Sequence, residues 1–123
     1  MIVGIGTDII AINRVMRACL RWPKFSSKIF TDDEWEYCNE GNNYGSLAAR
    51  FAGKEAVVKA LGTGMRNLDW TEVEIINDLA GAPFVVLHGK AQAVAEEKGI
   101  NQLLITLSHS KEYAVAYVVA LGG

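Results

Sequence analysis

The sequence predicts an α+β fold with a largely antiparallel sheet packed against helices. Apolar residues alternate with small or polar residues in short segments near both ends of the chain, and they follow a helical period between them. The strand-like segments are grouped rather than interleaved one by one with helices, which favours antiparallel pairing. With 123 residues and half of them hydrophobic, the chain is expected to form one domain over residues 1–123.

The N-terminal segment, residues 2–10, is expected to form a strand. Its residues alternate between an apolar face and a face that carries Gly4, Gly6 and Asp8. The missing side chains on that second face allow a neighbouring element or a ligand to come close to the backbone.

Residues 11–21 follow a helical period, and Pro23 is expected to end this helix. An apolar stripe is expected to be buried: Ile12, Val15, Met16, Cys19 and Leu20. The other side carries Arg14, Arg17 and Arg21. A solvated face is the ordinary interpretation of such a stripe, and docking of an acidic helix is the alternative.

The middle of the chain predicts two further helices. Thr31 and Glu34 form a capping box that opens a helix reaching about position 40. Ser46 can cap a longer helix, which ends before Gly62.

The last third of the chain predicts two hairpins. The expected strands are residues 71–76, 84–87, 103–107 and 113–121. A short helix ending at Gly99 separates the hairpins. Residues 108–112 are expected to form the turn of the second hairpin.

Composition and charge exclude several classes of function. Twelve basic and fourteen acidic residues give a formal net charge of −2, which argues against a general nucleic-acid binder. The longest apolar run, residues 113–121, is too short to span a bilayer, and no secretory signal is visible. Cys19 and Cys38 are expected to be free thiols. We therefore expect a cytoplasmic protein with no membrane or nucleic-acid partner.

Two places in the chain are candidates for chemistry: Asp8, and the pair Glu55 and Lys59. Asp8 ends an apolar strand beside the space left by the glycines, which suits a hard cation; capping of the next helix is the alternative. Glu55 and Lys59 are one helical turn apart and are expected to face the same way, at the edge of a packed surface. Together they suit a metal and a phosphate oxygen, and an ordinary exposed ion pair is the alternative.

The expected final turn contains His109, Ser110 and Lys111. A hydroxyl, an imidazole and an ammonium on one tight turn are suited to binding phosphate. The alternative is a solvated polar turn without a ligand.

Two motifs resemble those of the holo-acyl-carrier-protein synthases, the small bacterial type of 4′-phosphopantetheinyl transferase. The first is residues 4–14, Gly-Ile-Gly-Thr-Asp-Ile-Ile-Ala-Ile-Asn-Arg, and the second is residues 50–62, Arg-Phe-Ala-Gly-Lys-Glu-Ala-Val-Val-Lys-Ala-Leu-Gly. The resemblance covers nearly the whole chain. Two departures are visible: Gly53 stands where alanine is commoner, and Ala82 where lysine is frequent.

The resemblance implies a reaction and joins Asp8, Glu55 and Lys59 into one site. The 4′-phosphopantetheine group of coenzyme A would pass to a serine of an apo acyl carrier protein, releasing adenosine 3′,5′-bisphosphate. Asp8 and Glu55 would hold Mg²⁺, and Lys59 would offset charge on the leaving phosphate. Glu55 or a metal-bound water would remove the serine proton.

The same resemblance implies binding residues and an assembly. The candidates for contact with coenzyme A are Arg50, Lys59, His109 and Ser110, with Lys54 and Lys111 as further candidates. Arg14 and Arg21 would dock the carrier protein. A homotrimer with sites between subunits is implied. The alternatives are a non-catalytic module that binds carrier protein or coenzyme A, and a purely structural trimer subunit.

Overall fold

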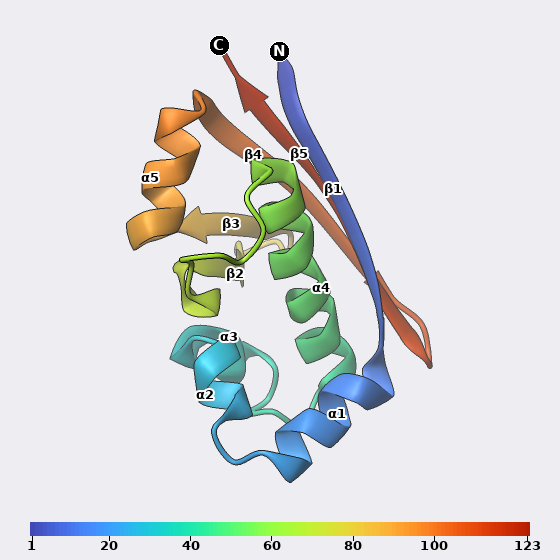
Figure 1. Ribbon diagram of the computed structural model, residues 1–123. Coiled ribbons are helices and arrows are strands. Elements are labelled where there is room, and N and C mark those ends of the chain that lie inside the picture. The colour runs from blue at the N-terminus through green and yellow to red at the C-terminus, as the bar shows by residue number, and fades with distance from the viewer.

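The computed structural model describes residues 1–123 and combines five strands with five α-helices (Figure 1). The strands are β1 (Ile2–Ala11), β2 (Val73–Asn77), β3 (Pro83–Leu87), β4 (Ile100–His109) and β5 (Tyr113–Gly122). The helices are α1 (Ile12–Arg21), α2 (Phe25–Ile29), α3 (Asp32–Tyr37), α4 (Tyr44–Leu61) and α5 (Gly89–Glu97), and a 3-10 turn, η1 (Trp70–Glu72), precedes β2. The α+β class and the antiparallel pairing are confirmed.

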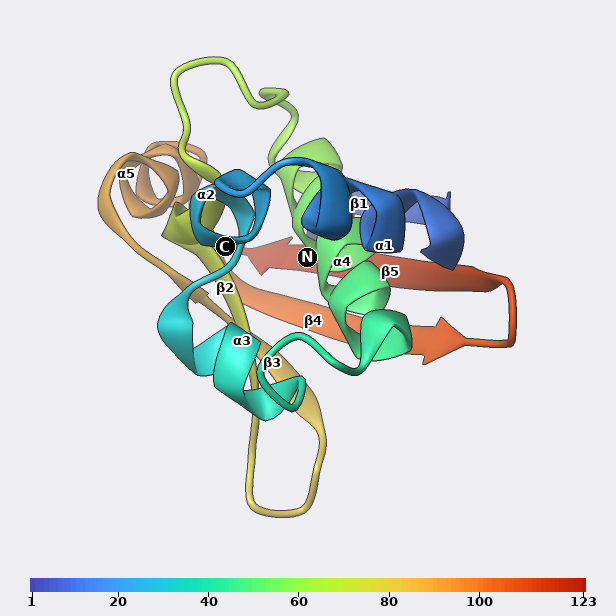
Figure 2. The same cartoon turned by 90° about the horizontal axis from the view of Figure 1, so that it is seen from below.

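The main sheet has the strand order β1-β5-β4, with both pairs antiparallel. The hairpin of β2 and β3 forms a separate two-stranded sheet. Helix α4 runs along one face of the main sheet, and the other helices and the small hairpin surround it on that side (Figures 1 and 2). The core therefore lies around α4, which is buried along most of its length.

The glycine-bearing face of β1 is the surface on which α4 packs. A Cβ atom on Gly4 would collide with the carbonyl of Ala60, and one on Gly6 with the carbonyl of Ala56. These two glycines therefore let a helix backbone, rather than a ligand, approach the strand. The expected alternation of β1 is confirmed, because the residues of the opposite face are the exposed ones.

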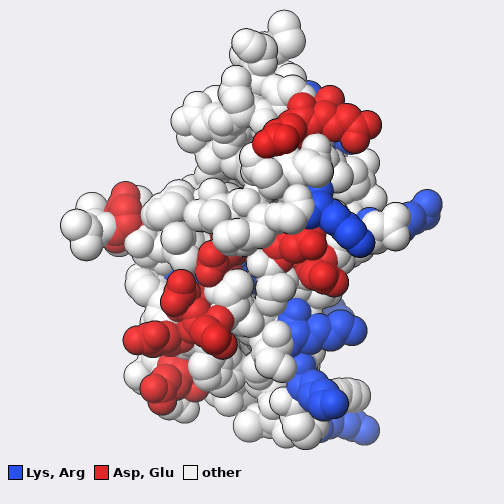
Figure 3. All heavy atoms as spheres, turned by 90° about the vertical axis from the view of Figure 1, so that its left-hand side faces the viewer, with Lys and Arg blue, Asp and Glu red and all other residues white.

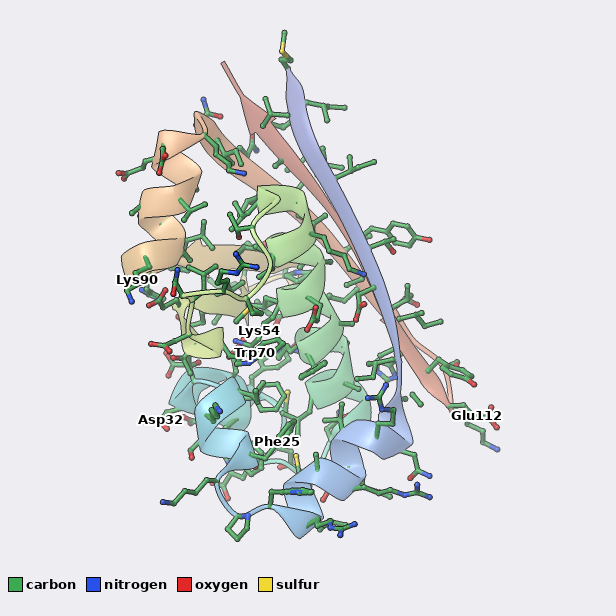
Figure 4. All side chains as sticks on the ribbon, viewed as in Figure 1. Phe25, Asp32, Lys54, Trp70, Lys90 and Glu112 are labelled. Carbon is green, nitrogen blue, oxygen red and sulfur yellow. The ribbon has the colours of Figure 1, made fainter.

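A buried ion pair joins α3, α4 and β2. Lys54 Nζ lies 2.8 Å from Oε1 of Glu34, and neither side chain is exposed. Lys54 also donates to the carbonyl oxygens of Trp70 and Val73, at 3.1 and 2.6 Å. Figure 4 shows Lys54 and Trp70 close together inside the molecule. Lys54 is thus a structural residue, and the expectation that it contacts coenzyme A is wrong, because its ammonium is enclosed by protein groups.

Glu34 also accepts two backbone hydrogen bonds. One comes from the N–H of Thr31, completing the predicted capping box of α3, and the other from the N–H of Ile75 in β2, both at 2.9 Å. One carboxylate therefore starts a helix, fixes a strand and neutralises Lys54.

Helix α2 was not expected from the sequence, because Pro23 ends the helical pattern and α2 itself is only five residues long. Aromatic stacking holds it in place: Phe25 packs on Phe51 of α4, with ring centroids 6.4 Å apart, and Phe51 packs on Trp70, at 5.0 Å. Figure 4 shows Phe25 facing inward from α2.

Two other expectations need correction. The helical period predicts Leu20 in the buried stripe of the first helix, but its side chain is 71% exposed, one residue before α1 ends at Arg21. His109 was placed in a turn, but β4 continues through it by pairing with Ala114. The turn therefore begins at Ser110. The prediction of two free thiols, Cys19 and Cys38, is confirmed.

Gly53, the departure from the commoner alanine, lies at a close contact. An added Cβ would collide with the terminal methyl of Ile75 and press against the side chains of Leu107 and Ile105. The glycine therefore allows β2 and the main sheet to approach α4 more closely than alanine would allow in this arrangement.

The second face of the main sheet carries no helix (Figure 1). Large apolar side chains on it remain exposed: Ile5, Ile9, Leu104, Tyr113 and Tyr117. An open apolar face of this kind is typical of a protein–protein interface. None of the helices has the length and apolar character that crossing a membrane requires.

Candidate active site

Asp8 and Lys59 meet where β1 packs on α4. Lys59 Nζ donates to Oδ1 of Asp8 at 3.1 Å and to the carbonyl oxygen of Thr7 at 2.9 Å. The Lys59 side chain is 52% exposed and that of Asp8 is 20% exposed, so the pair lies at the surface and contributes little to stability. Its position at the junction of a strand and a helix leaves it open to a ligand.

Glu55 lies one turn before Lys59 on α4 and is half-buried. Burial raises the pKa of its carboxyl, the negative charge of Asp8 raises it further, and Lys59 opposes both effects. The three side chains expected from the sequence to form one site are therefore brought together. Like charge at close range is unfavourable, and a bound cation would relieve it.

The alternative role of Asp8 as a helix cap is wrong. Helix α1 begins at Ile12, its N-cap residue is Ala11, and no side chain caps its backbone. The Asp8 carboxylate therefore has no partner in α1 and interacts with Lys59 instead.

The residues present fit a magnesium ion better than a metal held entirely by protein. No group of three or more His, Cys, Asp or Glu side chains is arranged to hold a metal. The site offers two carboxylates, Asp8 and Glu55. Mg²⁺ is commonly bound by one or two carboxylates, with waters and substrate phosphate oxygens completing its coordination.

Arg50 forms a second cluster on a different side of α4. Its guanidinium donates to Oδ1 of Asn77 and, at 3.4 Å, to the carbonyl of Ser46, and it lies 4.4 Å from the ring centre of Tyr37. The side chain is nearly fully buried, yet its Nε has no hydrogen-bond partner. A buried donor left unpaired is costly unless a ligand or water satisfies it.

A cavity of about 170 Å³ opens beside Arg50. It is lined by Tyr37, Ser46, Ala49, Arg50, Asn77, Gly81, Pro83, Leu107 and His109. The imidazole of His109 packs against Gly45, where an added Cβ would lie 2.8 Å from the ring. Arg50 and His109 are thus brought together, as two positively chargeable groups on one small cavity.

Ser110 and Lys111 lie outside this cavity. The Ser110 hydroxyl accepts from the backbone N–H groups of Glu112 and Tyr113, at 3.4 and 3.3 Å, and so closes the turn between β4 and β5. Lys111 is exposed and lines a separate groove against the start of α1. Figure 4 shows the neighbouring Glu112 at the tip of this hairpin.

The two clusters do not form one pocket within a single chain. The cavity at Arg50 and His109 includes none of Asp8, Glu55 and Lys59. Helix α4 carries members of both clusters but directs them to different sides, one toward β1 and the other toward β2 and β3.

The arginines of α1 lie on the surface and form no ion pair. Arg14, Arg17 and Arg21 are exposed, and the three ion pairs of the chain involve other residues. Lys24 and Lys28, also exposed, extend this positively charged surface beyond α1. In Figure 3, basic and acidic side chains gather on opposite sides of the lower half of the molecule, which α1, α2 and α3 make up. The sequence places the cations in α1 and α2 and the acids in α3.

Sequence reasoning missed the groups that surround Arg50. Tyr37 and Asn77 lie far from Arg50 in the chain, at the end of α3 and the end of β2. No local pattern distinguishes either residue, because their role depends on how the small hairpin packs against α4.

Comparison with known proteins agrees with the fold. Residues 4–118 match the model of the 4'-phosphopantetheinyl transferase superfamily. The holo-[acyl-carrier-protein] synthase of Alkaliphilus metalliredigens is 47% identical over 98% of this chain and 99% of its own length.

Solved structures of holo-acyl-carrier-protein synthases share this fold. The holo-ACP synthase of Plasmodium yoelii has a TM-score of 0.88 and 33% identity, covering 100% of this chain and 97% of its own. The holo-(acyl-carrier-protein) synthase of Bacillus anthracis, in complex with CoA (3',5'-ADP), has a TM-score of 0.81 and 34% identity, covering 100% and 99%. The fold and the family are therefore those of a group-transfer enzyme. The chain belongs to the 4'-phosphopantetheinyl transferase superfamily and, within it, to the holo-[acyl-carrier-protein] synthase family.

Proposed function

We propose that the protein transfers the 4′-phosphopantetheine group of coenzyme A to a serine of an apo acyl carrier protein and releases adenosine 3′,5′-bisphosphate. The observation that carries this proposal is the meeting of Asp8, Glu55 and Lys59 at one surface junction, in a chain of this family. The related structure with bound CoA (3',5'-ADP) supports coenzyme A as the donor.

Asp8 and Glu55 are the proposed ligands of Mg²⁺. A bound Mg²⁺ would neutralise charge on the pyrophosphate and fix its geometry. Glu55 has a second role in the proposal. Its carboxylate lies beside Asp8 and Lys59 and is proposed to remove the serine proton, directly or through a water.

Lys59 is proposed to offset the charge that grows on the leaving phosphate. Its ammonium is already oriented by Thr7 and Asp8, and half of its side chain remains exposed to an incoming ligand. A preoriented cation stabilises the transition state without the cost of being ordered during the reaction.

Arg50, His109 and Ser110 are proposed to bind the phosphates at the nucleotide end of coenzyme A. The unpaired Nε of Arg50 and the cavity it shares with His109 support the first two assignments. Ser110 directly follows the strand that ends at His109 and would contribute its hydroxyl from the turn.

The proposed active site is shared between subunits of a homotrimer. The cluster at Asp8 and the cluster at Arg50 face different sides of one chain, which supports a site that takes one cluster from each of two chains. The open apolar face of the main sheet offers a surface for assembly. Each chain would contribute one domain, residues 1–123, and the free thiols fit a cytoplasmic enzyme.

Arg14 and Arg21 are proposed to dock the carrier protein. Both are exposed and free of ion pairs, so they can meet carboxylates on a partner without breaking an internal contact. Opposite charge at such a surface mainly speeds and orients the encounter.

Mass spectrometry of the carrier tests the proposed reaction. The protein is incubated with coenzyme A, Mg²⁺ and an apo acyl carrier protein, and the carrier is weighed. We expect a gain equal to one phosphopantetheine group, abolished by Asp8→Asn and Glu55→Gln in samples that keep the fold and assembly, and retained in the surface control Lys90→Ala. Coenzyme A binding without any mass gain across a panel of carriers would instead indicate a non-catalytic module.

A further inference from the structure

The C-terminal end of α1 presents a stacked pair of exposed side chains. The guanidinium carbon of Arg21 lies 5.1 Å from the centre of the Trp22 ring, within the range of a cation–π contact. Arg21 is exposed and the Trp22 side chain is 43% exposed. The indole does not belong to the apolar core or to the side chains packed on it. The partly exposed Trp22 ring therefore contacts an arginine that is proposed to dock the carrier.

No acidic side chain competes for Arg21. Residues 9–31 contain five basic residues and no aspartate or glutamate. The three ion pairs of the chain lie elsewhere. A guanidinium stacked on a ring keeps the N–H groups at its edge free, so Arg21 can stack and bind a carboxylate at the same time.

Hydrogen bonds hold the backbone of Trp22 in a defined turn. Its N–H donates to the carbonyl of Ala18 at 3.0 Å, and its carbonyl accepts from the N–H of Phe25 at 3.0 Å. Pro23 restricts the chain immediately after it. The ring is thus attached to a defined turn between α1 and α2, whereas an arginine alone has many rotamers to lose on binding.

We propose that Trp22 is a positioning residue for carrier docking, holding the Arg21 guanidinium in the pose that meets an acidic helix of the carrier. This inference rests on the proposed function. The ring reduces the freedom that Arg21 loses on binding, so it strengthens docking without adding charge. Trp22 thereby acts on the Michaelis constant for the carrier and not on the chemical step.

A double-mutant cycle on transfer kinetics tests the proposal, with carrier concentration varied at saturating coenzyme A. We expect Trp22→Ala to raise KM for the carrier about two- to fivefold with kcat unchanged, the range given by an exposed cation–π contact. Trp22→Phe, which keeps a ring face, recovers most of the loss. In an Arg21→Ala background, Trp22→Ala has no further effect. Equal effects of Trp22→Ala in both backgrounds, or no recovery by Trp22→Phe, would overturn the proposal.

A second measurement needs no carrier or turnover. In NMR spectra of the free protein, the side-chain protons of Arg21 are expected upfield of their usual positions because of the indole ring current, and Trp22→Ala removes that shift. Unshifted Arg21 protons would overturn the proposal even if transfer occurs. Absence of transfer by the wild-type protein, with the shift present, would instead count against the proposed function.

Discussion

The ammonium of Lys54 and the carboxylate of Glu34 form an ion pair at 2.8 Å in which neither side chain is exposed to solvent. Every strong contact of this pair is made inside the protein, to α3, β2 and η1. The charges in the second sequence motif therefore divide by role: Lys54 supports the core, whereas Glu55 and Lys59 lie at the surface.

Removing one partner of the buried pair is expected to destabilise the fold strongly. Lys54→Met leaves the Glu34 carboxylate buried without its counter-charge, and we expect a loss of about 3–5 kcal/mol in the free energy of unfolding. The matched control is Lys59→Met in the exposed pair, with an expected change below about 1 kcal/mol. Urea denaturation measures both, and similar small losses would contradict the structural role of Lys54.

The contact between β1 and α4 is expected to exclude any side chain at Gly6. In Gly6→Ala, the new Cβ meets the Ala56 carbonyl, so the strand must move away from the helix. We expect a loss of about 1–3 kcal/mol, as for other overpacked sites. Ser108→Ala, at an exposed strand position, is the control and should unfold like the wild type. Wild-type thermal stability of Gly6→Ala would show that the strand does not pack this closely.

Stability is expected to respond to the charge of Glu55. Because burial and Asp8 raise its pKa, the ionised carboxylate opposes folding, and the penalty grows as pH rises from the unfolded-state pKa through the folded-state pKa. In metal-free buffer, Glu55→Gln should therefore melt at a higher temperature than the wild type at about pH 7, with the difference vanishing below about pH 3. A wild-type protein that gains stability over Glu55→Gln as pH rises would contradict the direction of the pKa shift.

Carrier docking is expected to depend on the charge of Arg14. Arg14→Glu should weaken binding of an acidic carrier and flatten the dependence of its association rate on salt, because a steering charge is reversed. Stopped-flow association at several salt concentrations measures this, with Lys90→Glu, on α5, as the control. Unchanged association at low salt would contradict a docking role for Arg14.

The sequence predicted most of the fold because its signals are local. The alternation of β1, the capping box of α3 and the glycine after α4 each lie within a few residues, and each is present as expected. The other helix ends differ from the prediction: α3 stops at Tyr37, and α4 begins at Tyr44 with Asn43, rather than Ser46, as its cap. Helix α2 was missed because its position depends on Phe51 and Trp70, which are distant in the chain. His109 was assigned to a turn because the pairing that extends β4 depends on its partner strand.

The residues of the candidate site could be predicted from the sequence. Their separation into a core residue, a surface cluster and a second cavity could not. Spacing on one helix indicated that Glu55 and Lys59 face the same way, and the family resemblance added Asp8. Spacing could not show that Lys54 is enclosed by Glu34, since that contact joins residues 20 positions apart. It also could not show that Arg50 faces a different cavity, which forms only when the β2–β3 hairpin packs on α4.

The central claim is that transfer occurs at a site made by two neighbouring chains, and subunit mixing tests it most directly. Asp8→Asn and His109→Ala proteins, each inactive or nearly so, are unfolded together, refolded at equal amounts, and assayed for phosphopantetheine on the carrier. With random assembly, about a quarter of the shared sites would receive an intact Asp8 from one chain and an intact His109 from the next, so we predict recovery to about that fraction of wild-type activity. No recovery from assemblies shown to contain both variants would contradict a shared site.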